Sequence, residues 1–150
     1  MNNARLRVLG VFLGLCLALV VAVGIIYAAS PTDTSLDGTW VNVNPNTRTL
    51  VKIVIAHRSG GITVHAFGAC HPRACNLGTV NGLVYSSGSN NSTGKAFTAQ
   101  YNSGFATDIL SGVLANTSNG ARLTVNDFEH YTDNSGRYDQ LNTDTFKKKP

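Results

Sequence analysis

Charged residues are scarce in this sequence of 150 residues: they make up 13% of it, and Glu129 is the only glutamate. Asp108, Asp127 and Asp133 are scattered, and neighbouring positions supply no paired carboxylates, no Ser-His-Asp order and no phosphate-binding loop. The sequence therefore offers no candidate catalytic residue and favours a role other than catalysis. A barrel can still bring distant carboxylates together, because strand pairing joins residues that are far apart in the sequence.

The chain also lacks the basic face with interspersed aromatic residues that nucleic-acid binding requires. Twelve lysines and arginines outnumber eight acidic residues, and the sequence pI is about 9.2. Arg5 and Arg7 lie at the N-terminus, however, and three further positive charges form the terminal run Lys147–Lys149. Without these five, seven basic residues remain against eight acidic ones, a balance of −1. We therefore expect no nucleic-acid partner.

An uncharged and largely apolar run extends from Val8 to Ser30, directly after Arg5 and Arg7. About 20 apolar residues are enough to cross a membrane, whereas the apolar region of a cleavable signal is usually about 7–15 residues long. Residues 1–30 are therefore predicted to be a signal anchor that spans the membrane through residues 8–29, with a cleaved signal peptide as the alternative. Because basic residues favour the cytoplasmic side, residues 31–150 are predicted to be an extracytoplasmic domain, either membrane-anchored or secreted into the periplasm or medium.

The predicted extracytoplasmic domain shows no helical periodicity of useful length. Instead, short apolar runs recur every 8–12 residues or so, with Gly, Asn, Ser and Asp between them, which is typical of an all-β domain. About eight strands are predicted, at residues 39–43, 49–57, 62–68, 80–85, 96–101, 105–114, 121–131 and 138–146. Sequential strands joined by short turns predict a small antiparallel up-and-down β-barrel, since closure removes exposed strand edges. A β-sandwich is the alternative.

Cys70 and Cys75 enclose the four residues HPRA. In an extracytoplasmic domain without another cysteine, the oxidising compartment favours a disulfide between them. A zinc site is a second interpretation, because His65 and His71 interleave with the two cysteines near the spacing of zinc ligands. A catalytic thiol is the third, and it requires a free thiolate beside a base. We adopt the disulfide, and we expect no metal and no cofactor.

Three stretches of the chain resemble a family of small exported bacterial proteins: GTWVNVNPNTR from Gly38, VHAFGACHPRACNLGTV from Val64 and FEHYTDNSGRYDQ from Phe128. The shared pattern is G-x-W-x-N followed by V-H-x-[WF]-G-x-C-H-P-x-x-C, and it extends over residues 36–146. The resemblance implies export but no particular activity. Separately, Gly38-Thr39-Trp40 resembles the first strand of lipocalin- and avidin-like (calycin-like) barrels, whose tryptophan plugs one end of the barrel.

These observations favour a non-enzymatic binding module. It would hold either a small apolar ligand inside the barrel, or a protein or envelope partner at the loop that the disulfide staples. The candidate ligand-binding residues are Trp40, His65, Phe67, Tyr85, Tyr101 and Phe128. A cavity above about 300 Å³ would favour the ligand, whereas an interior filled by side chains would favour a structural or interaction domain. The alternatives are an envelope-associated hydrolase that pairs His65 or His71 with a distant aspartate, and a structural zinc-binding domain.

Overall fold

The computed structural model describes residues 30, 31 and 33–150. The predicted signal anchor or signal peptide, residues 1–30, lies outside this part of the chain apart from Ser30, and it stays a prediction. Within residues 30, 31 and 33–150, no helix combines the length and the hydropathy that a membrane crossing requires.

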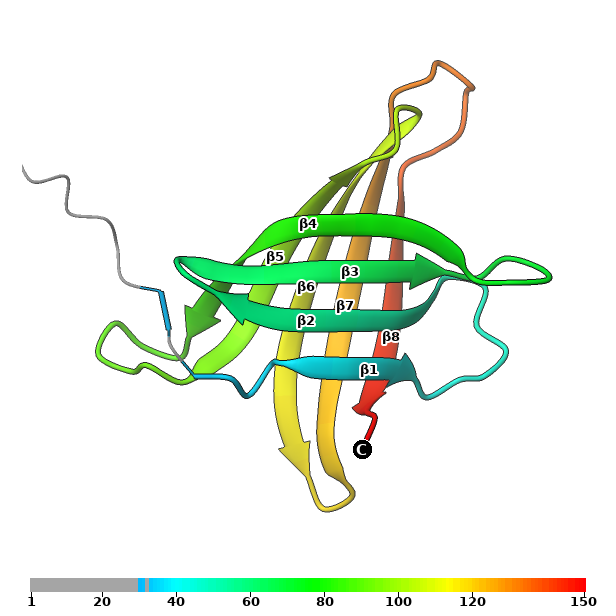
Figure 1. Ribbon diagram of the computed structural model, residues 1–150. Coiled ribbons are helices and arrows are strands. Elements are labelled where there is room, and N and C mark those ends of the chain that lie inside the picture. The colour runs from blue at the N-terminus through cyan, green and yellow to red at the C-terminus, as the bar shows by residue number, and fades with distance from the viewer. Residues whose placement is uncertain (1–29, 32) are drawn as a thin grey trace, which may run out of the picture.

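Eight antiparallel strands follow one another around a closed barrel in chain order, and the last strand pairs back onto the first (Figure 1). The strands are β1 (Gly38–Asn42), β2 (Leu50–Arg58), β3 (Gly61–Gly68), β4 (Cys75–Ser86), β5 (Gly94–Asn102), β6 (Ala106–Thr117), β7 (Gly120–Tyr131) and β8 (Gln140–Lys148). This topology confirms the predicted up-and-down barrel and excludes the sandwich. Every strand of the barrel therefore has a partner on both sides.

Strand β4 is longer than the sequence predicts, because it begins at Cys75 and not near Val80. Its register against β3 shifts between His65 and Phe67, and Gly78 has a φ of 88°. An irregularity of this kind interrupts the alternation of inward and outward side chains, so the sequence pattern gives no strand signal there. The added residues place Cys75 at the start of β4, next to the β3–β4 loop.

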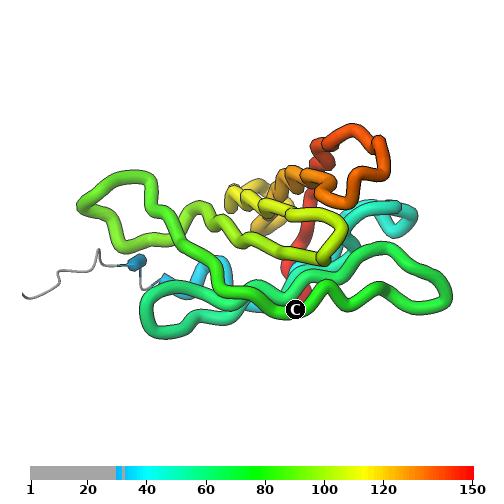
Figure 2. The backbone as a smooth tube through the Cα atoms, turned by 90° about the horizontal axis from the view of Figure 1, so that it is seen from above, coloured from blue at the N-terminus to red at the C-terminus, as the bar shows by residue number. Residues whose placement is uncertain are grey.

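The barrel has two different ends. The mouth carries the β1–β2, β3–β4, β5–β6 and β7–β8 loops, which gather at the right and upper right of Figure 1. The closed end carries the β2–β3, β4–β5 and β6–β7 turns together with residues 33–37, which precede β1. Figure 2 shows the β3–β4 and β4–β5 loops projecting from opposite ends of the molecule.

Trp40 fills the closed end of the barrel. Its side chain is fully buried, and its indole Nε1 donates a hydrogen bond of 2.8 Å to the carbonyl oxygen of Leu36. Leu36 is itself buried, so the segment before β1 covers the interior at this end. The tryptophan plug thus matches the position that the resemblance to avidin-like barrels implied. The core around it includes Ile53, Ile55, Ile62, Val64, Phe97, Leu110, Leu123, Val125 and Phe146.

Gly112 on β6 makes room for the buried ring of Phe97 on β5. The two residues are directly opposite each other in the sheet. A Cβ atom at position 112 would lie 2.1 Å from Phe97 Cε1 and 2.7 Å from Cδ1, far inside van der Waals contact. Because Phe97 is fully enclosed, its ring has no free space into which to move.

The substitution Gly112→Ala is therefore expected to lower the free energy of unfolding by about 1–3 kcal/mol, the usual cost of overpacking a core. Gly88→Ala is the matched control, because nothing lies within 4 Å of a Cβ atom at that position in the β4–β5 loop. It should change the free energy of unfolding by less than about 0.5 kcal/mol. Urea unfolding measures both variants, and equal stability of the two would show that Phe97 is not packed as described.

Candidate functional site

A cavity of about 490 Å³ opens at the mouth of the barrel. Its wall includes residues of β5, β6, β7 and β8 and of the β1–β2 and β3–β4 loops. A hollow of about 670 Å³ lies between the β4–β5 loop and Ser30–Pro31, but it is lined mainly by serine, asparagine and glycine and by no charged side chain. The mouth cavity combines enclosure by the barrel wall with charged groups, so it is the candidate site.

Inward-facing rows of side chains cross β6, β7 and β8 between the mouth and the core. Strand register fixes their members, since residues directly opposite each other point to the same face. From the mouth inward the rows are Asp108–Glu129–Gln140, Leu110–Asp127–Asn142 and Gly112–Val125–Asp144. Four of the eight acidic residues of the chain therefore lie on the inner face of these three strands.

Asp144 is the deepest of these carboxylates, and its hydrogen-bonding capacity is filled. Asn42 Nδ2 donates to its Oδ1 at 2.7 Å, and Thr49 Oγ1 donates to its Oδ2 at 2.6 Å. The hydroxyl of Thr47 and the backbone N–H of Leu50 also point to it, at 3.2 and 3.4 Å. Because every donor belongs to β1, β2 or the loop between them, Asp144 ties β8 to that loop.

Asp127 lies one row closer to the mouth, and its hydrogen bonding differs from that of Asp144. Its Oδ1 exposes less than 1 Å² and has no hydrogen-bond partner in the described part of the chain. Burial, followed by the nearby carboxylates of Asp108, Glu129 and Asp144, raises the pKa of Asp127 to about 7. Burial and Glu129 also raise the pKa of Asp108. We call Asp108, Asp127 and Glu129 the acidic mouth.

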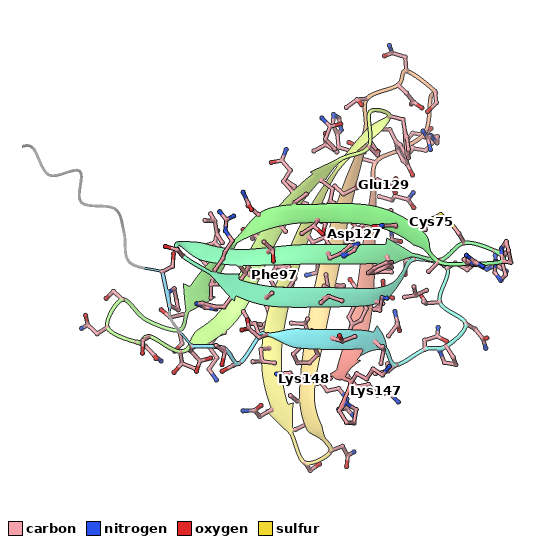
Figure 3. The ribbon with its side chains drawn as sticks, in the orientation of Figure 1. Cys75, Phe97, Asp127, Glu129, Lys147 and Lys148 are labelled. Atoms are coloured by element: carbon pink, nitrogen blue, oxygen red, sulfur yellow. A yellow bond between two sulfur atoms is a disulfide. The ribbon has the colours of Figure 1, made fainter. Side chains whose placement is uncertain are left out.

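The rest of the wall mixes one buried hydroxyl with apolar surface. Tyr101 donates its hydroxyl hydrogen to the carbonyl oxygen of Val64 at 2.7 Å, and burial raises the pKa of Tyr101, so the phenol stays neutral. Leu50, Leu110 and Phe105 contribute apolar surface to the same cavity. Figure 3 shows Asp127 and Glu129 at successive inward positions of β7, with Phe97 toward the closed end. The wall of the cavity thus combines carboxylates with apolar side chains.

A disulfide joins Cys70 and Cys75 at the rim of the mouth, with their Cα atoms 5.4 Å apart. This bond confirms the pairing that the sequence predicts. It also uses both thiols that the zinc site and the catalytic thiol would require, so those interpretations are wrong. Within residues 30, 31 and 33–150, no three His, Cys, Asp or Glu side chains are placed to hold one metal ion.

The structure separates the six ligand-binding candidates. Tyr101 lines the mouth, and Trp40 is buried at the closed end. The other four, His65, Phe67, Tyr85 and Phe128, lie on the outer face of the barrel, because their neighbours along each strand point inward. On that face the ring of His65 stacks on that of Phe67 with centroids 4.3 Å apart, and His65 Nε2 lies 2.7 Å from Asn76 Oδ1.

The acidic mouth is the part of the site that sequence reasoning did not find. The scattered acidic residues give no motif, and β7 carries aromatic and acidic residues at alternate positions near its end. The signal that could have found them is the inward alternation of Leu123 and Val125, which continues to Asp127 and Glu129. The wall of the mouth is therefore more polar than an apolar ligand would require.

The histidine–aspartate pairs of the hydrolase alternative do not form. In the described part of the chain, neither His65 nor His71 pairs with a carboxylate. The pair that hydrogen-bonds is His130 Nδ1 with Asp139 Oδ2, at 2.7 Å, and this bond lowers the pKa of Asp139. Both side chains are more than half exposed beside the β7–β8 loop, at 66% and 59%, so water solvates this pair.

Comparisons with known proteins support the fold. No family model and no curated protein matches the chain. Among solved structures, a low-affinity mutant of shwanavidin matches with a TM-score of 0.54 and 18% sequence identity, over 83% of this chain and 100% of that chain. This likeness shows that the two proteins share a barrel fold, and it agrees with the resemblance at Gly38-Thr39-Trp40. The resemblance to a family of exported bacterial proteins stays a prediction.

The raised pKa of Asp127 predicts a specific dependence of stability on pH. Between about pH 4 and 7 the folded state binds more protons at this carboxyl than the unfolded state, so the free energy of unfolding falls as pH rises through that range. Asn does not titrate. From pH 4 to pH 8, Asp127→Asn should therefore gain about 1–2 kcal/mol of stability relative to the wild type, a figure discounted for partial contact with water.

Asp139→Asn is the control of opposite sign. The pKa of Asp139 is lowered, so its contribution to stability is present at neutral pH and is lost as pH falls. Urea unfolding of the three proteins at pH 4, 6 and 8 measures both trends. A stability difference between Asp127→Asn and the wild type that does not change with pH would contradict the assigned environment of Asp127.

Proposed function

We propose that this protein is a non-enzymatic, extracytoplasmic binding module that holds a small molecule in the mouth of its barrel. The observation that carries this proposal is the cavity of about 490 Å³ at one end of a barrel whose other end is filled by Trp40. Ligand cavities typically have volumes of about 300–1,000 Å³ and combine apolar walls with a few polar groups. The mouth has both properties.

The wall of the mouth is held in place before any ligand arrives. The strands beneath it form a closed ring, Asp144 fastens the β1–β2 loop, and the disulfide fastens the β3–β4 loop. A preformed wall favours affinity, because binding then costs little conformational entropy. A preformed site of this kind is suited to binding ligands of one particular shape.

The disulfide also supports the extracytoplasmic location, because such bonds are typical of oxidising compartments. Residues 8–29 would hold the module at the membrane, with release after cleavage as the alternative. The barrel would then lie outside the cytoplasm, where it meets molecules of the envelope or the medium. The alternative, a protein partner at the stapled loop, stays a prediction. The same loop also forms part of the rim of the cavity.

Blocking the mouth tests this function. Ala69 lines the cavity, and its backbone N–H donates to the Thr49 carbonyl oxygen at 2.7 Å, a bond that does not involve its side chain. Ala69→Trp should therefore fill the mouth without disturbing the loop. Ala115→Trp is the matched control, because Ala115 is exposed on the outer face of β6.

The full-length chain is screened by ligand-observed NMR against a fragment set that contains cationic, neutral and anionic compounds. We expect at least one fragment to bind the wild type and Ala115→Trp alike, and to bind Ala69→Trp about tenfold more weakly or not at all. Binding that survives Ala69→Trp would place the ligand elsewhere. A set without any ligand that depends on the mouth would refute the proposal.

A further inference from the structure

Among the described residues, the three carboxylates of the acidic mouth have no cationic partner. The ion pairs of the described residues involve Asp37, Asp133 and Asp139, and none involves the mouth. Glu129 accepts a hydrogen bond from the Gln140 amide at 3.1 Å, which supplies no charge. Arg48 lies at the edge of the cavity on the β1–β2 loop, where it is exposed to water.

This arrangement is unfavourable for the protein alone. Asp108 and Glu129 are directly opposite each other in the sheet, and like charges in such positions repel each other. Asp127 adds a third carboxylate on the next row, beside Leu110. A buried polar group without a partner costs free energy that a ligand with the matching group can recover. Unfavourable local arrangements of this kind are expected where residues form a ligand-binding site.

The carboxylate of Asp127 indicates where the matching group would lie, because Asp127 lines the cavity. Among the described residues, no donor reaches its Oδ1, which exposes less than 1 Å². Asp144, one row deeper, has four donors on its two oxygens. Asp144 thus has donors on both of its oxygens, whereas Asp127, which lines the cavity, has an oxygen that no donor of the described residues reaches.

We propose that the ligand of the mouth is an organic cation, in which an ammonium, amidinium or guanidinium group on a small apolar body faces Asp127, Asp108 and Glu129. This inference rests on the proposed function and specifies its ligand. A charged N–H donor in the cavity balances the charge of the Asp127 carboxylate and offsets the repulsion between Asp108 and Glu129. The apolar body fits against Leu50, Leu110 and Phe105, which line the same cavity.

Three probes of one shape test the charge preference: benzamidine, benzamide and benzoate carry charges of +1, 0 and −1 on the same ring. Their dissociation constants are measured by NMR titration with the full-length chain at pH 8. We expect benzamidine to bind at least about tenfold more tightly than benzamide, and benzoate to bind more weakly than either.

Two substitutions test whether the charge preference depends on Asp127. Asp127→Asn keeps the size of the side chain but removes the charge. The affinity for benzamidine should therefore fall to within about threefold of the affinity for benzamide, while the affinity for benzamide stays unchanged. Asp139→Asn is the matched control on the exposed β7–β8 loop, and it should leave all three affinities as they are. An unchanged affinity for benzamide shows that the Asp127→Asn barrel is intact.

Lowering the pH gives an independent readout. Benzamidine stays protonated between pH 5 and 8, whereas Asp127 gains a proton, so the affinity for benzamidine should fall about tenfold or more from pH 8 to pH 5. The charged groups that face Asp127 are Asp108 on β6, Glu129 on β7, Asp144 on β8 and Arg48 on the β1–β2 loop. Of the residues that the structure describes, no histidine lines this cavity.

The outcomes separate the two proposals. If benzamide or benzoate binds as tightly as benzamidine, and Ala69→Trp abolishes that binding, the cation preference is wrong while the binding module stands. If benzamidine does not bind at all, the inference fails, and the fragment set decides the proposed function. If no compound of either series depends on the mouth, both proposals fail.

Discussion

The hydrogen bonds that Asp144 accepts from β1, β2 and their connecting loop are the interaction on which this barrel depends. Closure of the ring rests on the pairing of β1 with β8, which extends only from Trp40 to Asn42. By contrast, β6 and β7 pair along their whole length, from Ala106 to Thr117. The bonds to Asp144 extend the short seam with four donors. A buried carboxylate that lost them would cost about 3–5 kcal/mol.

Asp144 also marks the boundary between two halves of the interior. Toward the closed end, the next row along β7 and β8 is Leu123 and Phe146, both fully buried. Toward the mouth, the next row contains Asp127 and Asn142. The same strands therefore supply an apolar core and a polar cavity, and the change occurs over a single pair of rows. The first half supplies the buried apolar core, and the second half lines the cavity.

The general fold follows from sequence patterns that act locally. Alternation in β2, the turns at Ser59–Gly61 and Asn119-Gly120, and the spacing of apolar runs predict an eight-stranded meander, and closure follows from the need to remove edges. The disulfide follows from the isolation of Cys70 and Cys75 in the predicted extracytoplasmic domain. Each of these features depends on residues that are near one another in the chain.

The site does not follow in the same way, because it depends on register. Near the end of β7, Phe128 points outward while Asp127 and Glu129 point inward, the reverse of the usual rule that the aromatic residue faces the core. Only the alignment of β7 against β6 and β8 places Asp108 beside Glu129 and Asn142 beside Asp127. This reversal places Asp127, a carboxylate with no cationic partner among the described residues, on the wall of the cavity. Carboxyl ¹³C NMR of Asp127 in the full-length chain, titrated with pH in the absence and presence of saturating benzamidine, tests it most directly. A pKa of about 7 that falls when benzamidine binds would agree with the account, whereas a pKa near 4 that does not respond to the cation would contradict it.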